Sequence, residues 1–302
     1  MTGNISEAIL ESNLADMPQL KGSLFEGRCL RSRLLTLLTW ILASLAAVPL
    51  LSIIYMLVVK GGSRINWETL TALPPAAFEF GGGIGPAIIG TLTMVALASS
   101  ISIPLGILAA IHLAEVAPHS KLAQTSRFLA KVLTGFPSIL AGVFVYASLV
   151  VVMKTYSAWA GGVALAVLML PTIILTAEEA LKQVPQKMKD AAYGMGCTRA
   201  QVIGRVTLPT GLPGVITGVL LAVAGAAGES APLLFTALFS TYYINGLEGL
   251  SEPTSSLSIL IYNFSGMPYD NQIELAWTAS LVLVMMILVL NVLARVLGRR
   301  KY

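Results

Sequence analysis

Charged residues are scarce in this chain of 302 residues, where Asp, Glu, Lys and Arg together make up only 11%. Soluble globular domains carry about 25% charged residues, so the composition excludes an ordinary soluble fold. The net charge of +4 must therefore be interpreted by position along the chain. It does not indicate nucleic-acid binding, and we expect no nucleic-acid partner.

Cysteine and histidine are almost absent as well. The two cysteines, Cys29 and Cys197, fall in segments that we place on the same inner side of a membrane, so we expect neither a disulfide nor a metal site. The two histidines, His112 and His119, follow an apolar run, and we interpret them as interfacial residues. No G-x-x-x-x-G-K-S/T stretch occurs, which excludes a P-loop for nucleotide phosphates. The sequence predicts a non-catalytic chain without a cofactor of its own.

Long apolar runs are what the chain has instead. A membrane-spanning helix needs about 20 predominantly apolar residues, and six segments meet this requirement. They are residues 34–59, 87–113, 128–153, 158–177, 214–238 and 275–297. The stretch TGFPS interrupts the third segment, and such breaks are tolerated where neighbouring helices satisfy the backbone. The sequence therefore predicts an all-α, polytopic membrane protein with six transmembrane helices.

The basic residues predict the orientation of these helices. All but three of the 19 Lys and Arg residues lie on one side of the six spans, the exceptions being Lys60, Arg64 and Lys154. Cytoplasmic segments carry an excess of Lys and Arg, so we expect both termini in the cytoplasm. The expected parts are a cytoplasmic tail 1–33, a first helix 34–59, an external Gly- and Pro-rich segment 60–86, a five-helix core 87–297 and a cytoplasmic tail 298–302.

The cytoplasmic loop 178–213 has a pattern of its own. Apolar residues recur at helical spacing up to Gly196, and Thr198 and Gln201 then have the spacing of a capping box. This pattern predicts two short helices, the second ending at Leu208-Pro209. Two interpretations fit such a hairpin: it lies on the membrane surface, or its small side chains dock into a groove on a soluble partner.

The same loop carries a family resemblance. DAAYGMG followed by VTLP resembles the EAA signature of ABC-importer permeases, with Asp190 in place of Glu and Val206 in place of Ile. The stretches GTLTMVALASSISIPLGILAAIHLAE and VLTGFPSILAGVF are similar to PstA-type permeases of phosphate-specific (Pst) importers. The resemblance covers nearly the whole chain from Gly85 and implies a type I ABC importer permease fold in the bacterial plasma (inner) membrane, surrounded by membrane lipid.

The resemblance also implies partners and a docking surface. The family pairs this subunit with a homologous permease, PstC, and with a PstB ATPase dimer that binds ATP and Mg. A binding protein, PstS, delivers phosphate from outside. The loop residues that would contact the ATPase are Asp190, Ala191, Ala192, Gly194, Gly196, Cys197 and Thr198.

The fifth apolar segment contains an acid, Glu229. On one continuous helix it shares a face with a stripe of small residues that includes Gly218 and Gly225, a pattern typical of helix packing in membranes. A charge facing lipid costs about 2.5–3.5 kcal/mol, so we expect Glu229 to face protein or a wet cavity. The positions to which we assign structural or packing roles are Gly135, Pro137, Gly218, Gly225, Gly228 and Pro209.

Candidate residues for the substrate pathway are one acid and five hydroxyls: Glu229, Ser230, Thr134, Ser138, Thr172 and Thr176. The family pattern has basic residues where this chain has Leu175 and Gly225, so an anion partner within this chain is missing. We expect a base from the second permease beside Glu229, or a protonated phosphate oxygen that donates to it. Transport of another oxyanion or small solute, and a stand-alone secondary transporter or channel, remain open alternatives.

Overall fold

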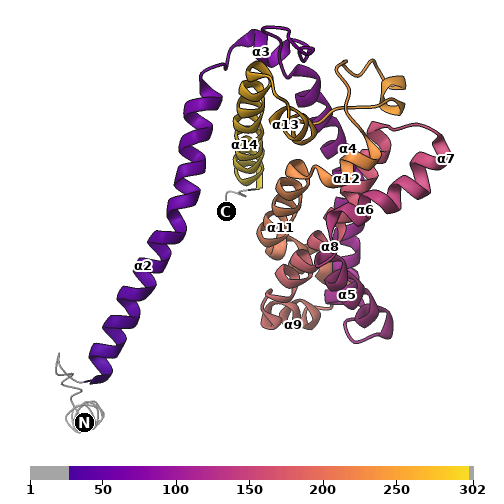
Figure 1. Cartoon of the computed structure of the whole chain (residues 1–302). Helices are drawn as coiled ribbons and strands as arrows, with labels where there is room; N and C mark the ends of the chain where they lie inside the picture. The colour runs from indigo at the N-terminus through magenta and orange to yellow at the C-terminus, as the bar shows by residue number, and fades with distance from the viewer. Residues whose placement is uncertain (1–26, 299–302) are drawn as a thin grey trace, which may run out of the picture. The chain divides into compact units, whose positions relative to one another are not determined.

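The computed structural model describes residues 27–298, and within that range every regular element is helical (Figure 1). The α-helices are α2 (Gly27–Met56), α3 (Trp67–Thr71), α4 (Gly85–Ile111), α5 (Lys121–Thr134), α6 (Ser138–Val145), α7 (Val151–Met153), α8 (Ala158–Lys182), α9 (Gln186–Gly194), α10 (Arg199–Val202), α11 (Leu208–Gly228), α12 (Ala231–Thr236), α13 (Leu257–Ser265) and α14 (Asp270–Gly298). Four π-helical turns and one 3-10 turn complete the set: η1 (Leu57–Gly61), η2 (His112–Val116), η3 (Tyr146–Val150), η4 (Ile203–Thr207) and η5 (Glu248–Ser251).

Five helical stretches are long and apolar enough to cross a membrane, and a sixth crossing arises if a bent pair counts as one span. The five are Leu30–Gly61, Gly85–Val116, Ala158–Lys182, Arg199–Gly228 and Asp270–Leu293. The predicted multi-span helical architecture is therefore confirmed. The bent pair is Lys121–Thr134 with Ser138–Met153, and its two arms meet at 107°. Pro137 explains this bend, because proline lacks an N–H and disfavours helical geometry in the residue before it.

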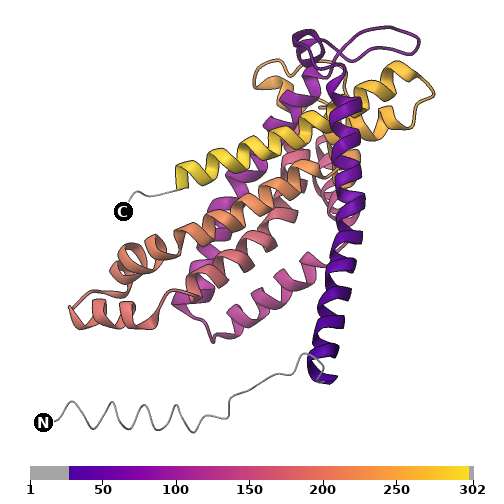
Figure 2. The ribbon, with the colours of Figure 1, turned by 90° about the vertical axis from the view of Figure 1, so that its left-hand side faces the viewer.

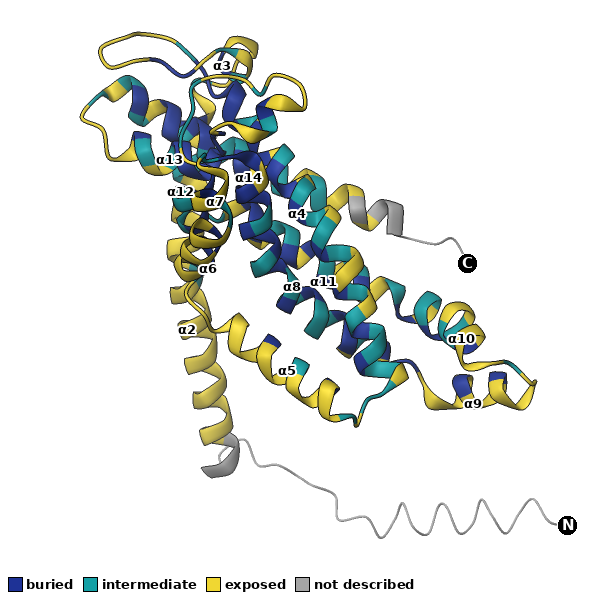
Figure 3. Cartoon of the chain, turned by 90° about the vertical axis from the view of Figure 1, so that its right-hand side faces the viewer, coloured by how far each residue is buried: buried dark blue, intermediate teal, exposed yellow. Residues whose placement is uncertain are grey.

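The described chain divides between Tyr55 and Met56 into two units. In the first unit, α2 forms a single apolar helix, and no residue of its most apolar window is buried (Figure 3). Side chains such as Leu45 and Leu51 are more than half exposed along it. Because α2 is apolar along its length, it requires an apolar environment.

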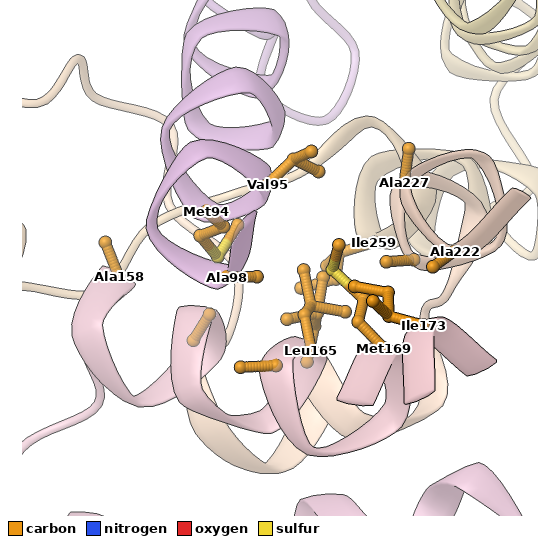
Figure 4. Packing of buried hydrophobic residues seen from close by; sticks show 14 residues of the cluster. Met94, Val95, Ala98, Ala158, Leu165, Met169, Ile173, Ala222, Ala227 and Ile259 are labelled. Carbon is orange, nitrogen blue, oxygen red and sulfur yellow. The ribbon is translucent and has the colours of Figure 1, made fainter. Parts of the chain in front are cut away.

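The core of the second unit lies between α4, α8 and α11, which run side by side (Figures 1 and 2). Figure 4 shows side chains of this core from all three helices: Met94, Val95, Ala98, Leu165, Met169, Ile173, Ala222 and Ala227. Many of its members are alanines, and small residues let helix backbones approach closely enough for extensive van der Waals contact. This close packing makes α8 a fixed support for the elements around it.

The two ends of the bundle differ. The elements α3 and α13 lie at one end, and α9 and α10 lie at the other with the start of α5 (Figures 1 and 3). At the first end, the segment expected to be a loop between the fifth and sixth spans contains a buried helix, α13. The side chain of Ser256 caps this helix by accepting a hydrogen bond from the N–H of Ile259 at 3.1 Å. The segment between the fifth and sixth predicted spans is therefore partly helical.

Two predicted helix boundaries around the fifth span are wrong. We expected the hairpin to end at Leu208-Pro209, but helix continues from Arg199 through η4 into α11, because Pro209 occupies the first turn of α11 where its missing N–H is tolerated. We also expected a continuous span over 214–238. Instead α11 ends at Gly228, and Glu229 has extended backbone (φ −73°, ψ 127°) before α12 begins.

Candidate functional site: a cavity between two helix breaks and an exposed hairpin

Two chain breaks lie close together in the second unit. One is the bend between α5 and α6, and the other is the break between α11 and α12. Helices α6 and α12 pack against each other directly after these breaks, because a Cβ atom on Gly142 would lie only 2.6 Å from Cα of Pro232. Only glycine permits this approach, so Gly142 allows α6 and α12 to pack in close contact.

A hydrogen bond from α13 supports the second break. The hydroxyl of Ser258 donates to the main-chain oxygen of Glu229 at 2.8 Å. Glu229 caps the end of α11, where carbonyl groups have no partner within the helix, so this bond satisfies a group that the break leaves free. The position of Glu229 is thus determined by its own helix end and by a side chain 29 residues further along.

A cavity of about 370 Å³ opens between the two breaks. We call it the break cavity, and its lining residues are Leu133, Thr134, Phe136, Ser138, Leu168, Met169, Thr172, Leu221, Ala222, Gly225, Ala226 and Glu229. They come from α5, α6, α8 and α11 and from the two chain breaks, so segments far apart in the sequence meet here. Four of the six pathway candidates predicted from the sequence therefore line one cavity.

The break cavity has acidic and hydroxyl groups but no basic one among its lining residues. Glu229 is half-buried and forms no ion pair within residues 27–298. The hydroxyl of Thr134 donates to the main-chain oxygen of Lys131 at 2.8 Å. Those of Ser138 and Thr172 have no hydrogen-bond partner in the part of the chain that the structure describes, so both are free to meet a polar ligand.

The other two pathway candidates lie outside the break cavity. The hydroxyl of Thr176 donates back to the main-chain oxygen of Thr172 at 2.6 Å, which is the usual behaviour of threonine within a helix. Ser230 stands at the start of α12 and is not among the lining residues. The structure therefore separates these two hydroxyls from the set that surrounds Glu229.

The stripe of small residues on α11 also divides into two parts. Gly214 and Gly218 face α8, where added side-chain atoms would press against Ala180 and Thr176. A Cβ atom on Gly225 or Gly228 would meet nothing within 4 Å. The expected helix packing thus exists at Gly214 and Gly218, whereas no neighbour in the described chain packs against Gly225 or Gly228.

Substituting the two kinds of glycine with arginine should give opposite results. Gly225→Arg should fold with nearly unchanged stability, because the new side chain would enter the break cavity. Gly218→Arg should lower the free energy of unfolding by about 1–3 kcal/mol or more, because its first side-chain atom would overlap Thr176. Thermal unfolding of the purified variants in one detergent measures the difference. Equal melting temperatures for the two variants would contradict this division.

The hairpin formed by α9 and α10 agrees with its predicted pattern. Pro185 precedes α9, and Gly196 has φ +83°, a backbone conformation that favours glycine. The capping box is present: Thr198 accepts from the N–H of Gln201 at 3.4 Å, and Gln201 Oε1 accepts from the N–H of Thr198 at 2.8 Å. The predicted turn at Gly196 and the predicted helix start at Thr198 are therefore confirmed, whereas the second helix is not short, because it continues into α11.

Most of the predicted docking residues are exposed on this hairpin (Figure 3). The exposed ones are Asp190, Ala191, Gly194, Gly196 and Thr198. Ala192 is buried and Cys197 is half-buried, so these two support the hairpin from within. The sequence pattern missed Met195, whose side chain is 78% exposed beside the turn. The hairpin thus presents small residues together with three large side chains, Met188, Tyr193 and Met195.

Three ion pairs lie at this end of the bundle. Arg127 Nε on α5 and Glu178 Oε1 on α8 are 2.5 Å apart, and Lys182 Nζ lies 2.6 Å from the same carboxylate oxygen. Lys189 Nζ on α9 lies 2.5 Å from Glu115 Oε1 in η2. Sequence reasoning did not find the contacts of Arg127 with Glu178 and of Lys189 with Glu115, because these residues are adjacent only in the folded chain, whereas Lys182 and Glu178 are four positions apart on one helix.

Comparison with known families places this fold and hairpin in a class. The chain matches, over residues 102–301, the family of binding-protein-dependent transport system inner membrane components. Its fold is similar to that of a bacterial ABC transporter involved in the import of the acidic polysaccharide alginate, with a TM-score of 0.59, 17% identity and coverage of 94% of this chain and 99% of the other. It is also similar to the inward-facing MetNI methionine ABC transporter, with a TM-score of 0.51, 21% identity and coverage of 72% and 91%. The protein is a membrane component of the ABC importer class.

Two relatives define its place within that class. The phosphate transport system permease protein PstA of Yersinia pestis is 38% identical over 252 residues, which are 83% of this chain and 84% of the relative. PstA of Pasteurella multocida is 36% identical over 280 residues, which are 92% and 98% of the two chains. The chain belongs to the PstA family of phosphate transport system permease proteins. The family and fold expected from the EAA-like loop are therefore confirmed.

Proposed function

We propose that this chain is one of two permease subunits of an ATP-driven phosphate importer, and that the break cavity is its contribution to the substrate pathway. The single observation that supports the pathway best is that Thr134, Ser138, Thr172 and Glu229 line one cavity in a chain of the PstA family. Polar groups at two broken helices are typical of solute sites in membrane transporters. A homologous PstC permease would form the other half.

The charge of the break cavity supports the need for this second permease. An unpaired carboxylate repels an anion, and the repulsion is strong in a medium of low dielectric constant. Leu175 and Gly225 occupy the positions where the family pattern has basic residues, and Gly225 has open space beside it. We propose that an Arg or Lys of the second permease fills this space, neutralises Glu229 and binds the phosphate oxygens.

The α9–α10 hairpin is proposed to be the coupling element of this subunit. Basic residues are abundant at this end of the bundle, which by the positive-inside rule faces the cytoplasm. Its exposed small side chains would let a PstB ATPase subunit approach the helix backbone closely. ATP and Mg would bind to the PstB dimer, and PstS would deliver phosphate to the opposite end of the bundle. This subunit would then carry out no chemical step itself.

Uptake of labelled phosphate into vesicles tests the proposed function. The vesicles contain this chain with its partner permease and ATPase, with ATP on the ATPase side and the loaded binding protein on the other. We expect uptake that requires ATP and that excess sulfate or molybdate does not inhibit. Uptake of a different oxyanion would contradict phosphate as the substrate. Uptake without ATP would instead indicate a secondary transporter or channel.

The missing basic residues favour one second candidate, a different solute in the same ABC class. Leu175, at one of the two positions where the family pattern has a basic residue, lines another cavity of about 410 Å³ between α8 and α11. Its polar lining residues are Thr176, Glu179, Gln183 and Thr217, so here too an acid is present without a base. The competition arm of the vesicle experiment separates this candidate from phosphate, because the preferred solute would inhibit uptake at the lowest concentration.

A further inference from the structure

The contacts of the α9–α10 hairpin with η2 are made by charged side chains. Within α9 the buried residues are Lys189 and Ala192, so an aliphatic core holds little of this helix. Lys189 Nζ lies 2.5 Å from Glu115 Oε1, and their side chains are only 10% and 9% exposed. Surface ion pairs contribute little, but a pair shielded from water to this degree interacts strongly and is sensitive to loss of either partner.

A second basic residue of the hairpin reaches the same place. The guanidinium of Arg199, in the first turn of α10, donates to the main-chain oxygens of Glu115 and Val116. These oxygens stand at the end of η2, where the helix stops and carbonyl groups lack helical partners. Lys189 and Arg199 therefore hold η2 from both helices of the hairpin, and we call these two residues together with Glu115 and Val116 the η2 clamp.

The clamp joins the hairpin to α4, which is part of the buried core of the bundle. The π-helical turn η2 follows α4 without interruption, as Gly85–Val116 forms one helical stretch. Helix α4 in turn packs along α8 through Met94, Val95 and Ala98 (Figure 4). A displacement of the hairpin would thus reach α4 through the clamp and would reach α11 directly through η4.

We propose that the η2 clamp transmits movement of the α9–α10 hairpin to α4, with Lys189 as the positioning residue that couples ATP hydrolysis to opening of the pathway. This inference rests on the proposed function, because it requires an ATPase that docks on the hairpin. If movement of the hairpin reached the pathway only through the continuous helix from α10 to α11, loss of the clamp would not change the coupling of ATP hydrolysis to transport. The ratio of ATP hydrolysed to solute taken up distinguishes the two cases.

The test compares three variants in the reconstituted complete transporter. Lys189→Met removes the charge and keeps the aliphatic length of the side chain. The double variant Glu115→Lys with Lys189→Glu reverses the pair and keeps the attraction. Lys121→Met is the matched control, because Lys121 is an exposed lysine on α5 and forms no ion pair within residues 27–298. Phosphate uptake and ATP hydrolysis are measured in the same vesicles, with the amount of bound ATPase subunit as a check on assembly.

We expect Lys189→Met to raise the ATP consumed per phosphate by about tenfold, in the range of coupling effects seen for single substitutions, while the ATPase stays bound. The reversed pair should recover most of this loss, and Lys121→Met should match the unaltered chain. An unchanged ratio in Lys189→Met, or uptake and hydrolysis that fall together in an assembled transporter, would overturn the proposal.

Two further outcomes are also decisive. If Lys189→Met fails to assemble, the conservative Glu115→Gln replaces it in the comparison, since the amide keeps an acceptor for Lys189 without the charge. A raised ratio in that variant then supports the proposal, and a normal ratio contradicts it. If the unaltered transporter takes up no phosphate but another solute, the proposed substrate is wrong, and the clamp is tested with that solute instead.

Discussion

ATP-driven uptake should fall at least tenfold when Gly196 is replaced by valine. Gly196 adopts φ +83°, where a residue other than glycine costs about 1–3 kcal/mol and a β-branched one more. The turn between α9 and α10 would shift to relieve this strain. A Cβ atom at this position meets nothing within 4 Å, so the described chain itself has room for the side chain. The loss is therefore expected in docking to the ATPase, and it is measured as uptake and as ATPase bound to the membrane.

Gly196→Asn provides the matched comparison. Asparagine tolerates the left-handed backbone region better than other residues with a side chain. We expect this variant to retain most of the uptake, because it keeps the turn and adds a short polar group. Normal uptake by the valine variant would show that the hairpin does not dock through this turn. Equal loss in both variants would mean that any added side chain blocks the partner, and that backbone strain is not the cause.

Phosphate uptake should fall by about 10²-fold when Glu229 is replaced by glutamine. The substitution keeps the size of the side chain and removes the charge that we propose to be paired with a basic residue of the second permease. Removing one partner of a buried charge pair at an interface costs about 2–5 kcal/mol, largely because the other charge remains without compensation. Initial rates of labelled phosphate uptake measure the effect, and bound ATPase measures assembly.

The control for this prediction is Glu248→Gln. Glu248 is an exposed acid in η5, outside the break cavity, and should be neutral for uptake. A smaller loss in Glu229→Gln than in Glu248→Gln would contradict a pathway role. If Glu229→Gln instead transports well but accepts sulfate, Glu229 acts as an acceptor for the proton of hydrogen phosphate, and the pairing with a base would be the wrong explanation.

The helical fold could be predicted because its cause is local in the sequence. Apolar runs of span length permit only a helix in a membrane, and the capping box around Thr198 depends on residues three apart. The bend at Pro137 was visible for the same reason. The break after Gly228 was not, because Glu229 continues the spacing of the small-residue stripe and its extended backbone is held by Ser258 from another helix. Pro232 was the one local sign, and it is compatible with the first turn of a new helix.

The residue types of the candidate site could be predicted from the sequence, but which of these residues meet in one cavity could be predicted only in part. Hydroxyls next to helix breaks indicated a polar cavity, and the structure brings Thr134, Ser138 and Thr172 together with Glu229. Thr176 lies on the same helix as Thr172 but lines a different cavity, between α8 and α11. Which cavity each threonine lines depends on where α11 packs against α8. The clamp from Lys189 to Glu115 could not be anticipated, because pattern rules compare neighbours in sequence and these residues are 74 positions apart.

The open space beside Gly225 has a consequence for how the transporter is assembled. A subunit inserted alone would carry Glu229 without compensating charge, whereas its partner would carry a base without an acid. Each unpaired subunit would be less stable in the bilayer than the assembled pair, by several kcal/mol, and association of the two subunits would remove this cost. Dividing one ion pair between two polypeptides in this way would enforce a one-to-one stoichiometry, since unpaired copies of either subunit would be the ones most exposed to unfolding and proteolysis.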